Sequence, residues 1–182
     1  MHQCVQRFLE IWDDLIRFFT EQVFSEKSNV AENYLLLFNN PLIKGYFCFL
    51  EYTLNILNIY NASFQGRESM IPELQPASAR LLQFFLCWFL KPAVIKHLDL
   101  VTQIYFSSQS NQVPPNEVEL GTVCELHLEE ALQKRLVESE MINLRENCLW
   151  FYIPVSNEIR SRLPHDDLCI RRYSTVHRCG NI

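Results

Sequence analysis

Apolar residues recur at steps of three and four positions in the first part of the chain. From about residue 3 to 24 they form one stripe, made of Val5, Phe8, Leu9, Trp12, Leu15, Ile16, Phe19 and Val23. This period is typical of an amphipathic helix that buries one side. Either the rest of the chain or a partner has to cover the stripe. We therefore take four of its residues as a candidate partner face: Phe8, Trp12, Leu15 and Phe19.

Two further helices are marked by their capping residues. A short helix is expected from Val30 to Phe38, with Ser28 or Asn29 as its N-cap. The dipeptide Asn40-Pro41 then predicts the start of a longer helix that runs to about residue 64. Asparagine caps a helix well, and proline suits the first helical position because its missing N–H would be unpaired there.

The stretch from Ala77 to Leu90 is apolar nearly all round, which predicts the central buried helix of the fold. Pro72 and Pro76 bracket its start, and Pro92 follows its end. A long loop is expected around residues 99–118, where Pro114-Pro115 forbids regular structure. Loops of this length are uncommon in compact domains, so we expect mobility or a boundary there.

The last third of the chain predicts two helices, at about 117–132 and 138–162, with a kink or break at Pro154. Residues 171–182 are expected to form a disordered tail. The predicted fold class is therefore all-α, an irregular bundle of about six helices. We assign residues 1–170 to one helical domain.

Composition supports helices packed on helices. The chain of 182 residues is 48% hydrophobic and holds 13 Phe but only 4 Gly, the residue that supplies the tight turns of small β domains. Several of the 7 Cys stand inside apolar runs, as in Phe47-Cys48-Phe49. Buried free cysteine behaves as a small hydrophobic residue. This usage predicts reduced thiols and an intracellular protein.

Charge and hydropathy disfavour two classes of partner. The formal net charge is −5, and the nearest approach to a basic cluster is Arg171, Arg172 and Arg178 near the C-terminus, which we interpret as solvated charge. DNA binding by this chain alone is therefore not expected. The most apolar window, Leu81–Leu90, has half the length of a membrane span, and no leader pattern opens the chain. No membrane partner is expected.

The sequence contains no complete catalytic or metal-binding motif. Cys124 and His127 have the spacing of a zinc half-site, but a second pair from His165 and Cys169 fits no standard template. No phosphate-binding loop, dinucleotide fingerprint or nucleophile elbow is present. We assign no catalytic residue, no metal site, no cofactor and no small-molecule substrate, and we do not expect an enzyme.

Five short motifs occur in an order that resembles a known family. A helix opens at Asn40-Pro41 and ends in Tyr60-Asn61-Ala62-Ser63-Phe64-Gln65; an apolar helix precedes Lys91-Pro92-Ala93-Val94-Ile95; the segment Asn147-Cys148-Leu149-Trp150-Phe151-Tyr152 leads to Arg162-Leu163-Pro164. This succession resembles vertebrate host-gene proteins derived from hAT-superfamily DNA transposases, over about residues 8 to 170.

The resemblance implies a limited set of properties. Such transposases are ribonuclease-H-like enzymes in which three acidic residues hold divalent metal and a large helical insertion splits the fold. The matching part of this chain corresponds to the insertion, and it lacks motifs for the first two catalytic aspartates, the N-terminal zinc finger and the C-terminal dimerisation segment. The resemblance therefore carries over no catalytic residue. It implies a nuclear, domesticated relic of a transposase.

Two functions from different classes follow. The first is a non-catalytic remnant that acts through protein contacts, with a protein partner or a second copy bound through the first helix. The alternative is a nucleic-acid-binding module that keeps an ancestral DNA association. An active nuclease would need converging carboxylates that the sequence does not provide.

Overall fold

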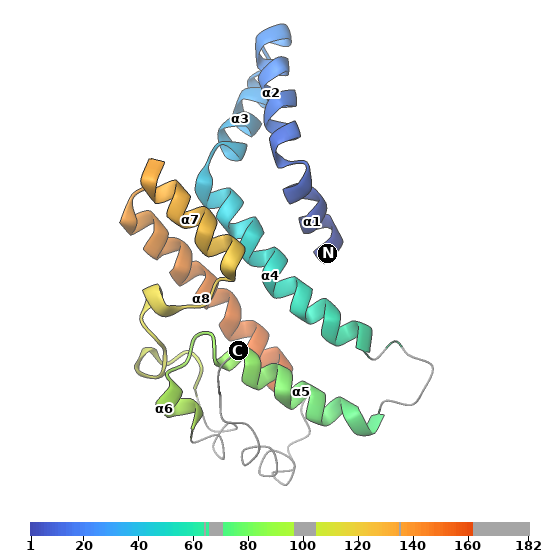
Figure 1. Ribbon diagram of the computed structural model, residues 1–182, viewed down its shortest axis with the longest axis vertical. Coiled ribbons are helices and arrows are strands. Elements are labelled where there is room, and N and C mark those ends of the chain that lie inside the picture. Colours follow the sequence, from blue (N-terminus) through green and yellow to red (C-terminus); the bar gives the residue numbers. More distant parts are fainter. Residues whose placement is uncertain (64, 66–70, 97–104, 135, 162–182) are drawn as a thin grey trace. The chain divides into compact units, whose positions relative to one another are not determined.

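The computed structural model describes residues 1–63, 65, 71–96, 105–134 and 136–161. Within these residues the fold is all-α, as predicted, with eight α-helices and no strand (Figure 1). The helices are α1 (His2–Glu10), α2 (Trp12–Glu26), α3 (Asn29–Phe38), α4 (Pro41–Ser63), α5 (Ile71–Leu86), α6 (Pro92–Ile95), α7 (Thr122–Lys134) and α8 (Glu138–Ser161). The expected tail at 171–182, the arginines in it, and His165 and Cys169 lie outside the described residues.

The chain groups into two compact units. Unit 1 comprises Met1–Ile59 and Leu120–Cys148, and unit 2 comprises Tyr60–Glu119 and Leu149–Ile182. The helices α4 and α8 each contribute residues to both units. The sequence pattern predicts a single helical domain over 1–170, because apolar periodicity is similar on both sides of these boundaries and contains no signal for the division.

The first helix of unit 1 is interrupted. The expected helix over about 3–24 is two helices, α1 and α2, separated at Ile11, whose backbone lies at φ −100° and ψ 12°. The apolar period continues unchanged across Ile11, so the pattern could not reveal the break. Trp12, the first residue of α2, is buried and its indole Nε1 donates a hydrogen bond to the Phe38 carbonyl at 3.2 Å.

Helices α2 and α3 form an antiparallel hairpin (Figure 1). Lys27 turns the chain with a left-handed backbone at φ 47°, and the Ser28 hydroxyl accepts a hydrogen bond from the Ala31 N–H at 3.4 Å. The predicted N-cap is thereby confirmed. Across the hairpin, the Phe19 ring stacks on Tyr34 and Phe38 at centroid distances of 5.2 and 5.6 Å.

The rest of unit 1 is a packed group of α4, α7 and the first part of α8. The side chain of Asn40 caps α4 by accepting from the Leu42 N–H at 2.9 Å, as Asn40-Pro41 predicts. Gly45 of α4 lies so close to the neighbouring helices that a Cβ there would be 3.0 Å from Leu144 Cδ1 and 3.3 Å from Leu128 Cδ2. Because glycine has no side chain, the ends of Leu144 and Leu128 pack directly against the backbone of α4 here.

The helix α7 begins later than the expected residue 117. Gly121, directly before it, has a positive φ of 87°, a conformation that a residue with a side chain adopts only with strain. The segment before Gly121 is instead the short 3₁₀ helix η3 (Pro115–Glu117) followed by extended backbone. A left-handed glycine therefore determines where α7 starts.

Unit 2 is built on aromatic contacts of α5 and the residues just after it with the second part of α8. Phe85 and Phe89 lie 6.0 and 5.9 Å from the Tyr152 ring, and Phe89 is parallel to it within 12°. Trp88 also contacts Tyr152, at 5.3 Å. All four side chains are buried, which confirms that this apolar stretch contributes to the core.

The helix α8 continues past Pro154 to Ser161 as one element, with Pro154 on its exposed side.

The helix predicted for Ala77–Leu90 has different ends. It begins at Ile71, contains Pro76, and ends at Leu86. The residues after Leu86 donate and accept hydrogen bonds with the segment 111–119 instead: the Phe89 carbonyl accepts from the Val113 N–H at 3.0 Å, and the Trp88 carbonyl accepts from the Glu119 N–H at 3.1 Å. The N–H groups of residues 87–90 still donate to carbonyls of α5, while the carbonyls of Trp88 and Phe89 pair with this distant segment and not with a continued helix.

The described part of the expected long loop is packed. It holds η3 and the 3₁₀ helix η2 (Gln109–Asn111), and Phe106 and Val118 are almost fully buried. The guanidinium of Arg160 lies 4.3 Å from the centroid of the Phe106 ring, within cation–π distance. The Gln112 side chain donates to the Phe106 carbonyl at 2.7 Å. In residues 105–118 the segment is an ordered part of unit 2.

Gly121 provides a direct test of unit 1. A Cβ at this position would lie 2.5 Å from Cγ of Tyr52, in addition to the strain of the positive φ. We expect Gly121→Ala to lower the free energy of unfolding by about 3 kcal/mol. The measurement is urea denaturation followed by circular dichroism, and Thr122→Ala, at the exposed neighbouring residue, is the matched control. Equal stability of both variants would contradict the assigned backbone conformation.

Candidate functional site

The structure places the four residues of the predicted partner face in different environments. Trp12 is 2% exposed and packs against Phe38 and Phe47, at centroid distances of 5.0 and 5.5 Å. Leu15 and Phe19 are half-buried, and Phe19 is stacked against α3. Phe8 alone is exposed, at 43%, and it also contacts Phe47. The expectation that these four side chains form one uncovered face is therefore wrong, because α3 and α4 cover most of it.

An exposed apolar surface exists instead on the hairpin, mainly on α3. Val30, Tyr34 and Leu37 are 46–63% exposed, and their spacing of four and three places them on one stripe of the helix. The Tyr34 ring is also stacked on Phe19 of α2, at a centroid distance of 5.2 Å. We call Val30, Tyr34 and Leu37 the hairpin face.

The helix α3 carries two apolar stripes where a helix on a protein surface needs one. Ala31, Leu35 and Phe38, also spaced by four and three, are the less exposed set, with Ala31 buried and Phe38 in contact with Trp12 and Phe19. The second stripe is the hairpin face. The run of apolar residues from Tyr34 to Phe38 contains this signal, because consecutive apolar residues cannot all face one neighbour.

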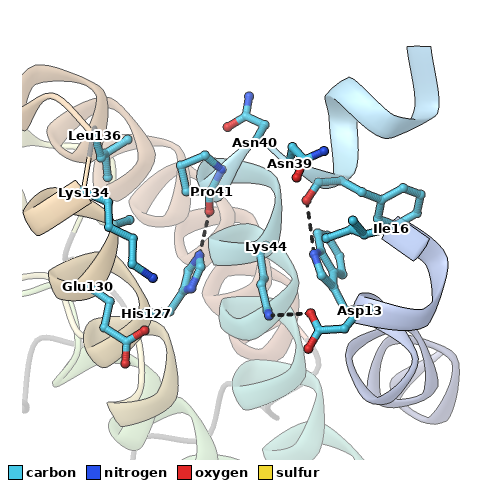
Figure 2. A pocket seen from close by; sticks show the side chains of 13 residues that line it. Asp13, Ile16, Asn39, Asn40, Pro41, Lys44, His127, Glu130, Lys134 and Leu136 are labelled. Carbon is cyan, nitrogen blue, oxygen red and sulfur yellow. Dashed lines mark hydrogen bonds and ion pairs between the residues drawn. The ribbon is translucent and has the colours of Figure 1, made fainter. Parts of the chain in front are cut away.

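A pocket of about 520 Å³ lies at the base of the hairpin in unit 1 (Figure 2). Its apolar wall includes Trp12, Ile16 and Leu136, and its polar rim carries Asp13, Lys44, His127, Glu130 and Lys134. This volume falls in the range of small-molecule sites. Sequence patterns did not indicate the pocket, because its residues come from α2, the α3–α4 junction, α7 and the residues after α7.

Three of the polar side chains around the pocket, His127, Lys44 and Asp13, have partners within the protein. The ring Nε2 of His127 donates to the Pro41 carbonyl at 2.9 Å, and Lys44 Nζ lies 3.9 Å from Asp13 Oδ1 (Figure 2). Lys44 also stands 5.8 Å from the centroid of the Trp12 ring. The rim thus combines both signs of charge, and its contacts stabilise the junction of the helices. These residues form no nucleophile–base pair.

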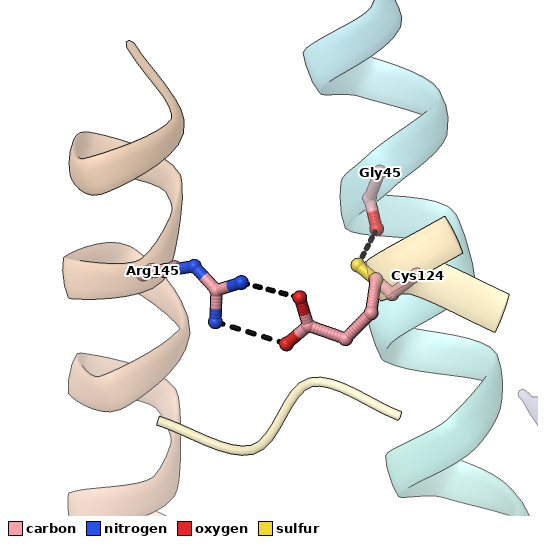
Figure 3. A network of polar contacts seen from close by, with 4 residues as sticks. Gly45, Cys124 and Arg145 are labelled. Atoms are coloured by element: carbon pink, nitrogen blue, oxygen red, sulfur yellow. Dashed lines mark hydrogen bonds and ion pairs between the residues drawn. The ribbon is translucent and has the colours of Figure 1, made fainter. Parts of the chain in front are cut away.

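A buried ion pair joins α7 to α8 in unit 1 (Figure 3). The guanidinium of Arg145 donates to both carboxylate oxygens of Glu125, from Nη1 to Oε1 at 2.9 Å and from Nη2 to Oε2. Arg145 is buried, while the Glu125 carboxylate keeps partial contact with solvent. Two parallel hydrogen bonds fix the relative orientation of the two side chains as well as their distance. We interpret the pair as structural.

The zinc half-site considered for Cys124 and His127 does not form. The Cys124 thiol donates to the Gly45 carbonyl at 3.4 Å, and His127 is directed to Pro41 (Figures 2 and 3). Among the described residues, no group of three or more His, Cys, Asp or Glu side chains could hold a metal ion. Each residue of the pair instead contacts a different carbonyl of α4.

Three buried thiols behave as core residues. Burial raises the pKa of Cys124 to about 12, and it also raises the pKa values of Cys48 and Cys148. The cause is loss of hydration, which disfavours the thiolate. All three are reduced, as are the exposed Cys4 and Cys87. A thiol held in its protonated form is a poor nucleophile and a poor metal ligand.

Helix length and hydropathy give a further result: no helix in the described parts of the chain is both long enough and apolar enough to cross a membrane. Comparisons with protein-family models, with curated proteins and with solved structures find no match for this chain.

The raised thiol pKa values predict that unit 1 loses stability at alkaline pH. An unfolded thiol releases its proton near its ordinary pKa of 9.0, whereas folded Cys124 keeps it until about 12. Between these values the unfolded state binds fewer protons, so the free energy of unfolding falls as pH rises. Urea denaturation at about pH 8 and about pH 10.5 measures the slope. Cys124→Ala should reduce it, while the exposed-site control Cys4→Ala should leave it unchanged.

The buried ion pair gives a second prediction. Arg145→Met leaves a partly buried carboxylate without its cation, and we expect a loss of about 2 kcal/mol in unfolding free energy. Replacing both partners by apolar residues, as in Arg145→Met with Glu125→Leu, should recover most of that loss. The exposed pair Arg7–Glu10 is the control, and Arg7→Met should cost less than about 0.5 kcal/mol. Additive losses in the double variant would contradict a coupled pair.

Proposed function

We propose that this chain is a non-catalytic interaction module that binds an amphipathic helix through the hairpin face. The observation that carries the proposal is the second apolar stripe of α3, which the fold leaves exposed. Anchor residues spaced by four and three are the pattern by which one helix packs on another. Burial of such side chains on binding is favourable in proportion to the apolar area removed from water.

The polar clusters of the molecule support a structural role elsewhere. The bidentate pair of Arg145 and Glu125 joins two helices, and the contacts of His127 and Lys44 join the base of the hairpin to α4 and α7. These contacts make unit 1 a scaffold that holds α3 in place. We further propose descent from the helical insertion of an hAT-type transposase, which the order of short motifs suggests.

A photo-crosslinking residue at Asn33, beside the stripe on α3, tests the function. In cells, the crosslinked peptides should map to the apolar side of a helix, either in another protein or in a second copy of this chain. Leu37→Glu should abolish these crosslinks by placing a charge on the hairpin face. Crosslinks that map to loops, or that survive Leu37→Glu, would refute the proposal.

The DNA-binding alternative stays a prediction from the resemblance. Its test is retention on heparin at moderate salt, with elution that depends steeply on ionic strength. Elution without retention would end it.

A further inference from the structure

We infer that the pocket at the base of the hairpin binds a small zwitterion with an apolar body, such as a free aromatic amino acid. This site is separate from the hairpin face, since no residue of that face lines the pocket. All lining residues belong to unit 1, and the volume of about 520 Å³ suits a small molecule. The walls combine an apolar surface with two pairs of opposite charge.

The apolar wall would hold the body of the ligand. Ile16, Phe38 and Pro41 line the pocket and are only half-buried, so they keep apolar surface that a ligand can cover. Behind them, Trp12 fixes the wall, because its indole Nε1 donates to the Phe38 carbonyl and its ring packs on the Phe38 ring. A rigid apolar wall beside a few polar groups is the usual composition of a small-molecule site.

Each side of the pocket carries one ammonium group and one carboxylate (Figure 2). On one side, Lys44 Nζ lies 3.9 Å from Asp13 Oδ1, which is longer than a hydrogen bond, and the Asp13 side chain is 88% exposed. On the other side, Glu130 and Lys134 lie one turn apart on α7 and are exposed. Neither of these two has an ion pair with another described residue. All four groups can therefore accept a charged partner.

The balance of these charges selects the ligand. A purely anionic molecule would face Asp13 and Glu130, and a purely cationic one would face Lys44 and Lys134. A molecule with both an ammonium group and a carboxylate can place each near the opposite charge. Complementarity of this kind contributes more to specificity than to affinity, and contacts between exposed charges are weak. We therefore expect a Kd on the order of 1 mM.

Four compounds test the chemical class. L-phenylalanine has the apolar body and both charges, hydrocinnamate lacks the ammonium group, phenethylamine lacks the carboxylate, and glycine lacks the apolar body. Each is titrated into the full isotope-labelled chain while the NMR signal of the Trp12 indole N–H is followed. L-phenylalanine should shift this signal saturably, and the other three compounds should each bind at least about fivefold more weakly.

Two pairs of adjacent carboxylates provide matched variants. Asp13 and Glu130 line the pocket, whereas their neighbours Asp14 and Glu129 do not, and all four residues are exposed. Asp13→Asn and Glu130→Gln should each raise the Kd for L-phenylalanine at least about threefold, while Asp14→Asn and Glu129→Gln should leave it within about 1.5-fold. Because the changes are nearly isosteric and lie at the surface, all four variants are expected to fold, which circular dichroism verifies.

Three results would overturn the site. The first is the absence of a saturable shift up to about 20 mM L-phenylalanine. The second is equal affinity for L-phenylalanine and either singly charged analogue, which would exclude the zwitterion. The third is an equal effect of Glu129→Gln and Glu130→Gln, which would exclude the pocket. Leu37→Glu should leave the Kd unchanged, so failure of the pocket and failure of the hairpin face are distinguishable.

Discussion

The close approach of α4 to α7 and α8 at Gly45 is the contact on which the rest of unit 1 depends. A Cβ at that position would lie 3.0 Å from Leu144 Cδ1 and 3.3 Å from Leu128 Cδ2, so both leucine side chains would have to shift by a few tenths of an ångström. The buried ion pair of Glu125 and Arg145, the Cys124 contact and the His127 contact all depend on this close packing of the three helices. The hairpin is attached to this group through α4, whose N-terminal cap follows α3 directly. The exposed stripe of α3 is thus held by a framework that has its own packed contacts.

Local features of the sequence predicted the elements well and their tertiary setting poorly. Ser28, Asn40 and Pro41 marked helix starts correctly, because capping depends on residues adjacent in sequence. The break at Ile11 left no mark, since the apolar period is the same on both sides. The end of α5 at Leu86 was missed because the carbonyls of Trp88 and Phe89 accept hydrogen bonds from a segment more than twenty residues away and not from a continued helix. Propensity and periodicity contain no information about such pairing.

The predicted interaction surface lies on the first helix, whereas the exposed apolar stripe lies on α3. The reason is related. An amphipathic stripe shows that a side will be covered, but it does not show by what. The stripe with Trp12 and Phe19 is covered by α3 and α4, and that arrangement leaves the second stripe of α3 exposed. The pocket beside it could not be predicted at all, because its lining comes from elements that are distant in sequence. The ion pair is likewise visible only once α7 and α8 are placed together.

The backbone pairing of residues 88–91 with 111–119 has an evolutionary consequence. Hydrogen bonds tie the segment at Lys91, Val113 and Glu119, and Phe106 and Val118 fill the interior of unit 2 beside them. Within residues 105–119, the exposed polar side chains of Ser107, Gln109, Asn116 and Glu117 can be exchanged at little cost. Insertions or deletions within residues 105–119 would shift the paired residues out of register and remove buried side chains from the core. Selection on this stretch should therefore conserve its length more strictly than its composition, the reverse of what is usual for a surface loop.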